Sequence, residues 1–323
     1  MVSEFDLIGR HFSRPAPAGM LGVGDDCALF SLAPGMQVAT STDMLLEGRH
    51  FLPDVDPAAL GHKALAVNLS DLAAMGARPL GCLLGLALPR ADEAWLAAFA
   101  AGFQDLAASH GCPLLGGDTT RSGQGVAISV TVFGEVAEGR ALRRDAGRPG
   151  DDVWVSGTLG AADVALALLQ GRLPADPARL AAARGALERP RPRVALGRAL
   201  AGLAHAAIDV SDGLLQDLGH ILAASGCGAR IESAALPVDP ALRGLPPDRV
   251  RQAVLGGGDV YELCFTADPA DRERVLAQAR LADTPVARIG RLAPPEQGLE
   301  VLDADGRPLA ALPAGFDHFG GEP

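Results

Sequence analysis

The sequence predicts a layered α/β protein built from two similar halves. Hydrophobic residues make up 48% of the chain but aromatic residues only 4%, so the core must consist mainly of Ala, Leu, Val and Ile, as in layered α/β folds. Stretches with strand and helix patterns alternate along the chain. A length of 323 residues exceeds one ordinary core and favours two domains of roughly 150 residues each.

The first half alternates strand-like and helix-like stretches. Apolar or alternating segments predict four strands, at Met36–Thr40, Pro79–Leu88, Pro113–Leu115 and Val126–Glu135. Helical spacing of apolar residues predicts two helices, at Leu60–Gly76 and Asp92–Ser109. Gly76 suits the C-cap of the first helix, and Asp92 suits the N-cap of the second. The first helix is expected to be amphipathic, with Asn68 and Asp71 on its polar face.

The second half repeats this alternation after a boundary near residue 140. The segment from Gly139 to Asp152 is rich in Arg and in Gly and Pro breaks, so we predict domains at 1–139 and 140–323. Strands are expected at Val153–Ser156, Ala207–Val210 and Tyr261–Thr266. Helices are expected at Ala161–Gln170, Val194–Leu203, Leu214–Ala224 and Ala270–Arg280.

Charge and hydropathy exclude several classes of partner. The formal net charge of −11 and the lack of a basic patch argue against binding to nucleic acid or to an anionic membrane. The longest apolar run, Leu80–Leu88, is about half of what a membrane span needs. Residues 1–10 lack the apolar core of a signal peptide. The five cysteines show no CxxC spacing and are expected to be reduced and buried. We therefore expect a cytoplasmic protein.

Five acidic clusters are the most informative feature of the chain. Each places a carboxylate beside glycine or a small hydroxyl residue, the oxygen ligands that Mg²⁺ prefers when it is shared with substrate phosphates. If the clusters converge, each close carboxylate pair costs on the order of 4 kcal/mol, so bound cations would be required. The clusters are Gly24-Asp25-Asp26, Ser41-Thr42-Asp43, Asn68-Leu69-Ser70-Asp71, Gly116-Gly117-Asp118-Thr119-Thr120 and Asp209-Val210-Ser211-Asp212-Gly213.

The first three clusters also have plain structural explanations. Asp25-Asp26 suits a polar turn, and Asp71 suits a solvated helix face. Ser41-Thr42-Asp43 suits a helix N-cap, but the residues after it do not have a helical pattern. We instead expect the strand Met36–Thr40 to deliver this cluster at its carboxyl end, where open α/β sheets place their ligands.

The glycine-rich and helix-opening clusters suit phosphate binding. In Gly116-Gly117-Asp118 the glycines let backbone N–H groups approach a phosphate, and Arg121 or Arg144 can neutralise its charge; a simple turn is the alternative. Of Asp209 and Asp212, one can cap the following helix while the other faces a ligand. The sequence contains no GxxxxGK[ST] loop, no GxGxxG after a strand and no kinase catalytic loop, so a nucleotide would bind on a different scaffold.

Taken together, these stretches resemble the thiamine-monophosphate kinases, a family in the superfamily of aminoimidazole ribonucleotide synthetase and selenophosphate synthetase. The resemblance runs over nearly the whole chain. The family's fold would be a two-domain PurM-like α/β (α+β) fold, with an N-terminal mixed sheet with helices and a C-terminal α/β domain. The resemblance further implies a homodimer formed by the N-terminal domains, with ATP near the interface held by several Mg²⁺ ions. The stretches that carry it most specifically are residues 22–28, 41–43, 63–76, 116–120, 208–213 and 261–263.

The resemblance assigns roles to individual residues. The family's metal ligands fall on Asp26, Ser41, Thr42, Asp43, Asp71, Asp118, Asp209 and Asp212. Its nucleotide contacts fall on Gly117, Asp118, Arg144 and Ser211, and its thiamine-phosphate contacts on His50, Asp259 and Phe316. His50 taken alone would be read as a structural histidine. Family members commonly read Gly-Gly-Glu-Asp-Tyr where this chain has Gly257-Gly258-Asp259-Val260-Tyr261, so one carboxylate is shorter and the other is absent.

We hypothesise that a phosphate oxygen of thiamine monophosphate attacks the γ-phosphorus of ATP in line. Because that phosphate is already ionised near neutral pH, no general base is needed, and Mg²⁺ on Asp43, Asp71 and Asp118 would bridge the transferring group. One alternative is an ATP-dependent synthetase of the same superfamily with another acceptor, but the N-terminal Cys with a nearby Lys that selenophosphate synthetases need is absent. Another alternative is a non-catalytic nucleotide-binding scaffold.

Overall fold

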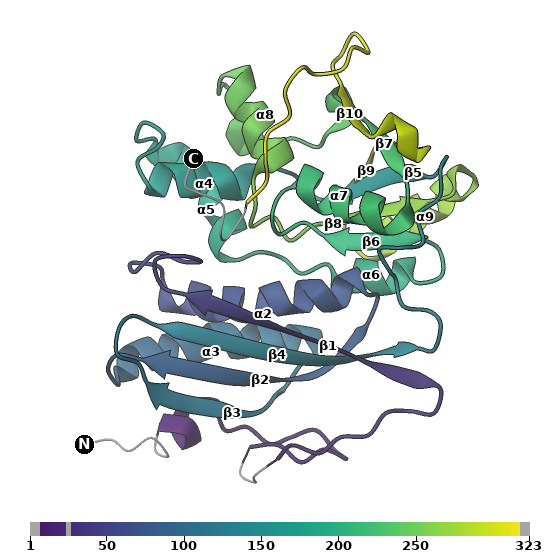
Figure 1. Cartoon of the computed structure of the whole chain (residues 1–323). Coiled ribbons are helices and arrows are strands. Elements are labelled where there is room, and N and C mark those ends of the chain that lie inside the picture. The colour runs from purple at the N-terminus through teal and green to yellow at the C-terminus, as the bar shows by residue number, and fades with distance from the viewer. Residues whose placement is uncertain (1–6, 24–26, 317–323) are drawn as a thin grey trace. The chain divides into compact units, whose positions relative to one another are not determined.

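The computed structural model describes residues 7–23 and 27–316 (Figure 1). The chain divides into two compact units: Met1–Leu72 with Ala77–Gly139, and Ala73–Gly76 with Arg140–Pro323. Each unit contains one β-sheet with its own helices. Among the described residues, the model contains no helix whose length and hydropathy would let it cross a bilayer.

The first unit is a four-stranded mixed sheet with two long helices on one face (Figure 1). The strand order is β1-β4-β2-β3, in which β4 runs antiparallel to both neighbours and β2 and β3 run parallel. The mixed sheet predicted for this half is therefore confirmed. Its elements are β1 (Met36–Leu46), α2 (Pro57–Ala74), β2 (Arg78–Leu88), α3 (Glu93–His110), β3 (Leu114–Arg121) and β4 (Ala127–Ala137), after a short helical segment at Ile8–Phe12.

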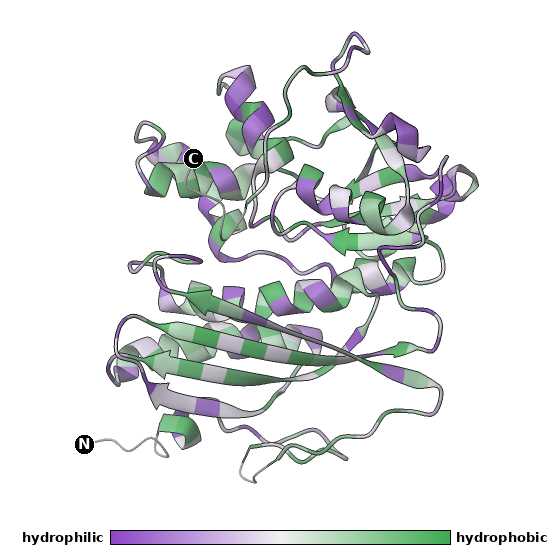
Figure 2. Ribbon diagram, viewed as in Figure 1, coloured by the Kyte–Doolittle hydropathy of each residue, from purple (hydrophilic) through white to green (hydrophobic). Residues whose placement is uncertain are grey.

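Packing in this unit follows from the residue patterns. The strand β2 is mostly apolar (Figure 2) and is largely buried, whereas β4 buries alternate residues, as its alternating pattern predicts. Two glycines bring α2 and α3 into contact. A Cβ on Gly61 would lie 2.0 Å from the Phe99 carbonyl oxygen, and one on Gly102 would lie 1.9 Å from that of Ala58. The predicted N-cap of α3 is confirmed, since the Asp92 side chain accepts a hydrogen bond from the Trp95 N–H.

Two predicted strand ends in the first unit are wrong. The strand β1 does not stop at Thr40, because its ladder with β4 continues from Met36–Ala137 to Leu46–Ala127. Likewise β3 does not stop before its glycines, since its parallel ladder with β2 continues to Arg121. The clusters that contain Asp43 and Asp118 therefore lie within strands rather than in turns at their ends.

The helix α2 is not amphipathic as predicted, because most of its side chains are buried. Asn68, which the sequence placed on a polar face, is fully buried, and so is Ser70. The polar atoms of Asn68 are satisfied inside the protein: its Nδ2 donates to the Ala64 carbonyl oxygen at 3.0 Å, and its Oδ1 accepts from the Asp43 N–H at 3.1 Å. Paired polar groups of this kind can be buried at little cost.

The second unit is built on a six-stranded sheet in the order β10-β7-β9-β5-β8-β6. All neighbours are antiparallel except β10 and β7. The strands are β5 (Asp152–Ser156), β6 (Ala206–Asp209), β7 (Gly228–Glu232), β8 (Leu263–Ala267), β9 (Val286–Ala293) and β10 (Leu299–Leu302). The helices are α4 (Ala161–Leu169), α5 (Pro177–Glu188), α6 (Val194–Leu200), α7 (Leu214–Ser225), α8 (Pro247–Gly256) and α9 (Arg272–Leu281), joined by short 3-10 segments.

The core of the second unit lies between one face of this sheet and the helix α7. Leu214, Leu218 and Ile221 of α7 are fully buried in one cluster with strand residues such as Val153 and Ile231. All five cysteines of the chain are free thiols, but Cys27 is exposed. The prediction that every cysteine is buried is therefore wrong at that position.

Candidate active site

In the first unit, the structure brings two of the predicted acidic clusters together. The Ser41 hydroxyl on β1 donates a hydrogen bond of 2.5 Å to Oδ2 of Asp71 on α2. Two residues further along β1, the Asp43 N–H donates to Asn68, which precedes Asp71 by one helical turn. The middle of β1 and the second half of α2 thus bring several oxygen-bearing side chains together. We call Ser41, Asp43, Asn68 and Asp71 the first acidic group.

The electrostatics of this group favour a bound cation. Burial and the nearby charge of Asp71 raise the pKa of Asp43 to about 7. Two carboxylates that raise each other's proton affinity are stabilised in their ionised form when a cation lies between them. The donors are hard oxygens, which suit Mg²⁺ rather than a softer transition metal. The residues therefore fit a magnesium ion that is shared with a phosphate.

Two predicted ligands in this unit do not join the first acidic group. The Thr42 hydroxyl donates instead to the Val130 carbonyl oxygen at 3.0 Å, and the pleat points Thr42 to the opposite face of β1 from Ser41 and Asp43. Asp118 is exposed on β3, which β4 and β2 separate from β1. Three interstrand steps amount to about 14 Å, so one ion cannot bridge Asp43 and Asp118 of the same chain.

Gly117 has a structural reason to be glycine. Its φ is +151°, and a Cβ there would lie 1.9 Å from the Leu84 carbonyl oxygen on β2. The residue therefore permits the close approach of β3 to β2. The sequence interpretation of this glycine as part of a phosphate cradle did not detect that constraint, because the constraint arises from a strand about thirty residues earlier in the chain.

His50 lies in the turn that follows β1. Its Nδ1 accepts a hydrogen bond of 2.9 Å from the Leu46 N–H, so Nε2 carries the proton in the neutral ring. The buried Lys63 ammonium donates to the His50 carbonyl oxygen at 3.3 Å. The imidazole is thus held by a hydrogen bond within its own turn.

In the second unit, three segments that are distant in sequence meet at the carboxyl end of β6. The loop after Asp209 pairs with the segment before β8, since the Asp259 N–H donates to the Ser211 carbonyl oxygen at 2.8 Å. The Phe316 N–H donates to the Asp212 carbonyl oxygen at 2.9 Å. Predicted metal, nucleotide and substrate residues are therefore neighbours here. We call Asp209, Ser211, Asp212, Asp259 and Phe316 the second acidic group.

The loop of the second acidic group is held by a residue that sequence reasoning missed. The buried Asp217, in the first turn of α7, accepts hydrogen bonds of 3.0 Å from the backbone N–H groups of both Ser211 and Asp212. The prediction that Asp209 or Asp212 caps this helix is wrong, because the N-cap residue is Gly213, which has no side chain to form a cap. Neither the Asp209 nor the Asp212 carboxylate therefore serves as the cap of α7.

The loop at residues 259–261, which contributes Asp259 to the second acidic group, has a strained backbone. Asp259 and Tyr261 have φ values of +58° and +53°, which L-residues other than glycine adopt rarely. The Tyr261 hydroxyl donates to Oδ1 of Asp259 at 3.2 Å. Such strain concentrates at functional sites, where the surrounding structure enforces it.

Glu262 connects this loop to neighbouring elements of the second unit. Its carboxylate forms two hydrogen bonds with the Arg193 guanidinium and accepts one from the Ser156 hydroxyl. Glu262 and Ser156 are both buried. A charge-assisted pair of this kind, shielded from water, connects the strained loop to β5 and to the start of α6.

Arg144 and Asp26 are the remaining predicted site residues. Arg144 is exposed, and Asp26 lies outside the described residues. Within residues 7–23 and 27–316, no three His, Cys, Asp or Glu side chains are arranged to hold a metal ion by themselves. The fit to Mg²⁺ therefore depends on a carboxylate pair that shares the ion with a phosphate, the arrangement that Mg²⁺ commonly adopts.

Comparison with known proteins identifies the class to which this fold belongs. The model of the AIR synthase related protein N-terminal domain matches residues 24–136, and that of the C-terminal domain matches residues 148–301. The thiamine-monophosphate kinase of Escherichia coli (strain K12) is 45% identical over 322 residues, which cover 98% of both chains. This chain belongs to the thiamine-monophosphate kinase family.

Solved structures agree. The crystal structure of thiamine-monophosphate kinase from Stenotrophomonas maltophilia K279a has a TM-score of 0.83 at 48% identity, covering 91% of this chain and 93% of that one. AaThiL, complexed with AMPPCP and TMP, has a TM-score of 0.77 at 32% identity, covering 90% and 89%. The two-domain PurM-like fold predicted from the sequence is confirmed.

Proposed function

We propose that this chain transfers the γ-phosphoryl group of ATP to thiamine monophosphate, giving thiamine diphosphate and ADP. The observation that carries the proposal is identity of 45% along the full length of a thiamine-monophosphate kinase. A related structure at 32% identity is a complex with AMPPCP and TMP. We take this as support for a site that holds the nucleotide and the acceptor together. Both acidic groups described above fit this chemistry.

In the reaction, a phosphate oxygen of thiamine monophosphate forms a bond to the γ-phosphorus as the bond to the β,γ-bridging oxygen breaks. ADP leaves with the bridging oxygen, and no proton must be removed because the attacking phosphate is ionised near neutral pH. The protein's task is to position two anions in line and to offset their repulsion. When bound, Mg²⁺ supplies the positive charge that the phosphates lack.

The proposal assigns the residues as follows. Residues 1–139 would bind metal and nucleotide phosphates and form the dimer, and residues 140–323 would complete the nucleotide and substrate site. Asp43 and Asp71 would hold one ion, and Asp209 and Asp212 another. Asp118 lies too far from Asp43 in this chain for a common ion and would serve a separate one. Ser211 and Arg144 would contact the nucleotide, with His50, Asp259 and Phe316 at the thiamine phosphate.

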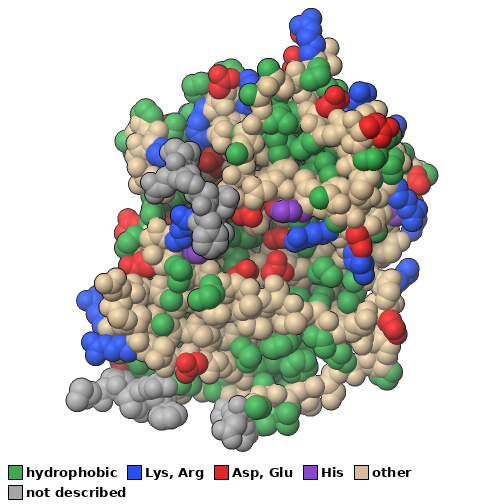
Figure 3. All heavy atoms as spheres, viewed as in Figure 1, with side chains coloured by type: hydrophobic (Ala, Val, Ile, Leu, Met, Phe, Trp, Pro, Cys, Tyr) green, Lys and Arg blue, Asp and Glu red, His purple; other side chains and the backbone are tan. Residues whose placement is uncertain are grey.

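We also propose that the chain forms a homodimer through the outer face of β1. Val38 is 50% exposed and Met44 is 60% exposed on this strand, and hydrophobic side chains are visible on the surface of the four-stranded unit (Figure 3). Exposed apolar residues on a sheet face favour burial against a second copy. Sedimentation of V38D/M44D, which is expected to be monomeric where the parent chain is dimeric, tests this interface.

The substrate assignment is tested by ADP release with three acceptors side by side. With Mg-ATP and thiamine monophosphate, ADP should form in step with thiamine diphosphate, whereas thiamine or no acceptor should give only background. The measurement couples ADP to NADH oxidation and quantifies thiamine diphosphate by chromatography. Equal ADP release with all three acceptors would refute the assignment to thiamine monophosphate.

A further inference from the structure

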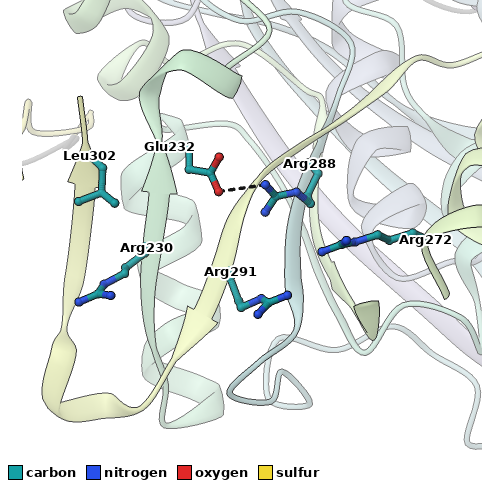
Figure 4. Close-up of a pocket in the computed structure, with 6 residues that line it drawn as sticks. All are labelled: Arg230, Glu232, Arg272, Arg288, Arg291 and Leu302. Atoms are coloured by element: carbon teal, nitrogen blue, oxygen red, sulfur yellow. Dashed lines mark hydrogen bonds and ion pairs between the residues drawn. The ribbon is translucent and has the colours of Figure 1, made fainter. Parts of the chain in front are cut away.

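The second unit contains an arginine-lined pocket that none of the proposed site residues line. Its volume is about 370 Å³, within the range of pockets that bind small molecules. It lies on β10, β7 and β9, whereas Asp209 lies on β6, at the opposite edge of the same sheet. The pocket (Figure 4) is lined by Arg230, Glu232, Arg272, Arg288, Arg291 and Leu302.

Two of these arginines face each other across a strand pair. Arg230 on β7 is directly opposite Arg291 on β9 in the antiparallel ladder. Like charges in that position destabilise a sheet. The same row of paired residues continues across the neighbouring strands. Glu300 on β10 pairs with Arg230, and Asp152 on β5 pairs with Arg291. The two acids moderate the repulsion but lie at the outer ends of the row rather than between the arginines.

The acidic residues in contact with the pocket do not require four arginines. Asp152 is fully buried, and Arg272 alone satisfies it with two hydrogen bonds, of 2.5 and 2.8 Å. Arg288 and Arg291 nevertheless lie 3.9 and 3.8 Å from the same carboxylate. Glu232 pairs with Arg288 and Glu300 pairs with Arg230, both at 2.9 Å. Three carboxylates thus contact four guanidinium groups, which leaves a positive charge in excess.

Arg291 is the arginine whose donors are available. Among the described residues its guanidinium has no hydrogen bond and only the 3.8 Å ion pair with Asp152. Its side chain is 54% exposed and lies between Arg230 and Arg272 in the pocket (Figure 4). A planar fork of free N–H donors matches the geometry of phosphate oxygens. In a chain with a net charge of −11, a positive pocket stands out as a local attractor for anions.

We propose that this pocket binds a small molecule through a phosphate or diphosphate group, at a site separate from the phosphoryl-transfer centre. The anion would lie between Arg230 and Arg291, relieve their repulsion and accept hydrogen bonds from the free donors of Arg291. Arg272 and Arg288, held by Asp152 and Glu232, form the preorganised wall of the pocket.

The test is calorimetric titration of the full chain with pyrophosphate and with inorganic phosphate, in the presence of a chelator so that no metal recruits the anion elsewhere. The variants are Arg291→Gln, Arg230→Gln and a matched control, Arg251→Gln, an exposed arginine that pairs with Asp248 on α8. Binding of pyrophosphate should weaken about tenfold or more in the first two variants, because each removes charge-assisted hydrogen bonds, and should stay unchanged in the control. Tighter binding of pyrophosphate than of phosphate would assign the diphosphate group.

Thermal unfolding separates binding from folding defects. Without anion, Arg291→Gln should melt no lower than the parent chain, since it removes one of two opposed like charges. With pyrophosphate, the parent chain and Arg251→Gln should gain thermal stability while Arg291→Gln gains less. Equal affinity of the parent chain and Arg291→Gln for pyrophosphate, or loss of binding in Asp212→Asn but not in Arg291→Gln, would overturn the proposal. Absence of binding to the parent chain would overturn it as well.

Discussion

At the scale of single residues, Asp217 shows how a buried carboxyl group positions a functional loop. It is 3% exposed and accepts two backbone hydrogen bonds from the loop that presents Asp212. Burial is the main cause that raises its pKa to about 7, and the charge of Asp212 adds to the effect, while the backbone hydrogen bonds oppose it. The folded protein therefore holds this proton more tightly than the unfolded chain does.

This linkage predicts a pH-dependent effect of Asp217→Asn. An unfolded Asp titrates near pH 4, so between pH 4 and 7 the unfolded state loses a proton that the folded state keeps. The contribution of Asp217 to stability is complete below about pH 4 and falls as the pH rises through 7. Asn keeps one acceptor oxygen and does not titrate. From pH 5 to pH 8, Asp217→Asn should gain stability relative to the parent chain, by roughly 2–3 kcal/mol.

Urea unfolding at both pH values, with a chelator present, measures this difference. Asp105→Asn is the control, because Asp105 is an exposed residue of α3. Its stability should change with pH as that of the parent chain does. A constant gap between Asp217→Asn and the parent chain, or a gap that changes in the opposite direction, would contradict the role of the buried proton.

Single site residues could be predicted from the sequence where the evidence lies in the residues next to them. Asp43 and Asp71 stand out because each lies beside small hydroxyl residues, and the structure places both in one group. Asn68 and Asp217 were missed as partners, because a polar helix residue reads as solvent-exposed until the backbone that it contacts is known. Burial of such groups depends on contacts that sequence spacing does not reveal.

At the scale of elements, β3 shows most clearly that tertiary contacts can outweigh a local sequence signal. Two adjacent glycines read as a turn, yet both lie within a strand paired to β2. Long helices with strong end signals, such as α3, were predicted nearly to the residue. The elements that were missed are α5, α8, β7, β9 and β10. They are short or carry many charged residues, as in β9, whose arginines line a pocket on an open sheet face. Their patterns therefore lack clear apolar periodicity.

The two glycines of β3 predict losses of stability of different size when each is replaced by alanine. In Gly117→Ala the new Cβ would overlap the Leu84 backbone, which cannot move away as a flexible side chain can. We expect a loss of stability of roughly 1–3 kcal/mol or more. In Gly116→Ala the nearest atom is the end of the Leu83 side chain at 3.3 Å, so the cost should stay below about 1 kcal/mol.

Chemical unfolding of both variants tests this interpretation of β3. A larger loss in Gly116→Ala than in Gly117→Ala would show that the glycines serve something other than strand packing. If Gly117→Ala is stable but inactive, the role of Gly117 lies at the phosphate rather than in the sheet.

At the scale of the whole molecule, each unit gathers its own acidic group, and each unit matches one of the two domains of AIR synthase related proteins. Repetition of strand, acidic turn and helix in both halves allowed the two-domain architecture to be predicted from the sequence. The separation of Asp118 from Asp43 was not predicted, because strand order in a mixed sheet is set by long-range pairing. A single ion on Asp43, Asp71 and Asp118 of one chain is therefore replaced by separate ions in our proposal.

Our proposal for the reaction depends on a cation that Asp43 and Asp71 hold together during phosphoryl transfer. It is tested most directly by steady-state turnover of Asp43→Asn and Asp71→Asn with Mg-ATP and thiamine monophosphate, with Asp105→Asn as the matched control. Each of the first two variants should lose kcat by on the order of 10²-fold or more, equivalent to about 3 kcal/mol of barrier, while the control keeps the activity of the parent chain. Near-normal turnover in both Asp43→Asn and Asp71→Asn would contradict the account.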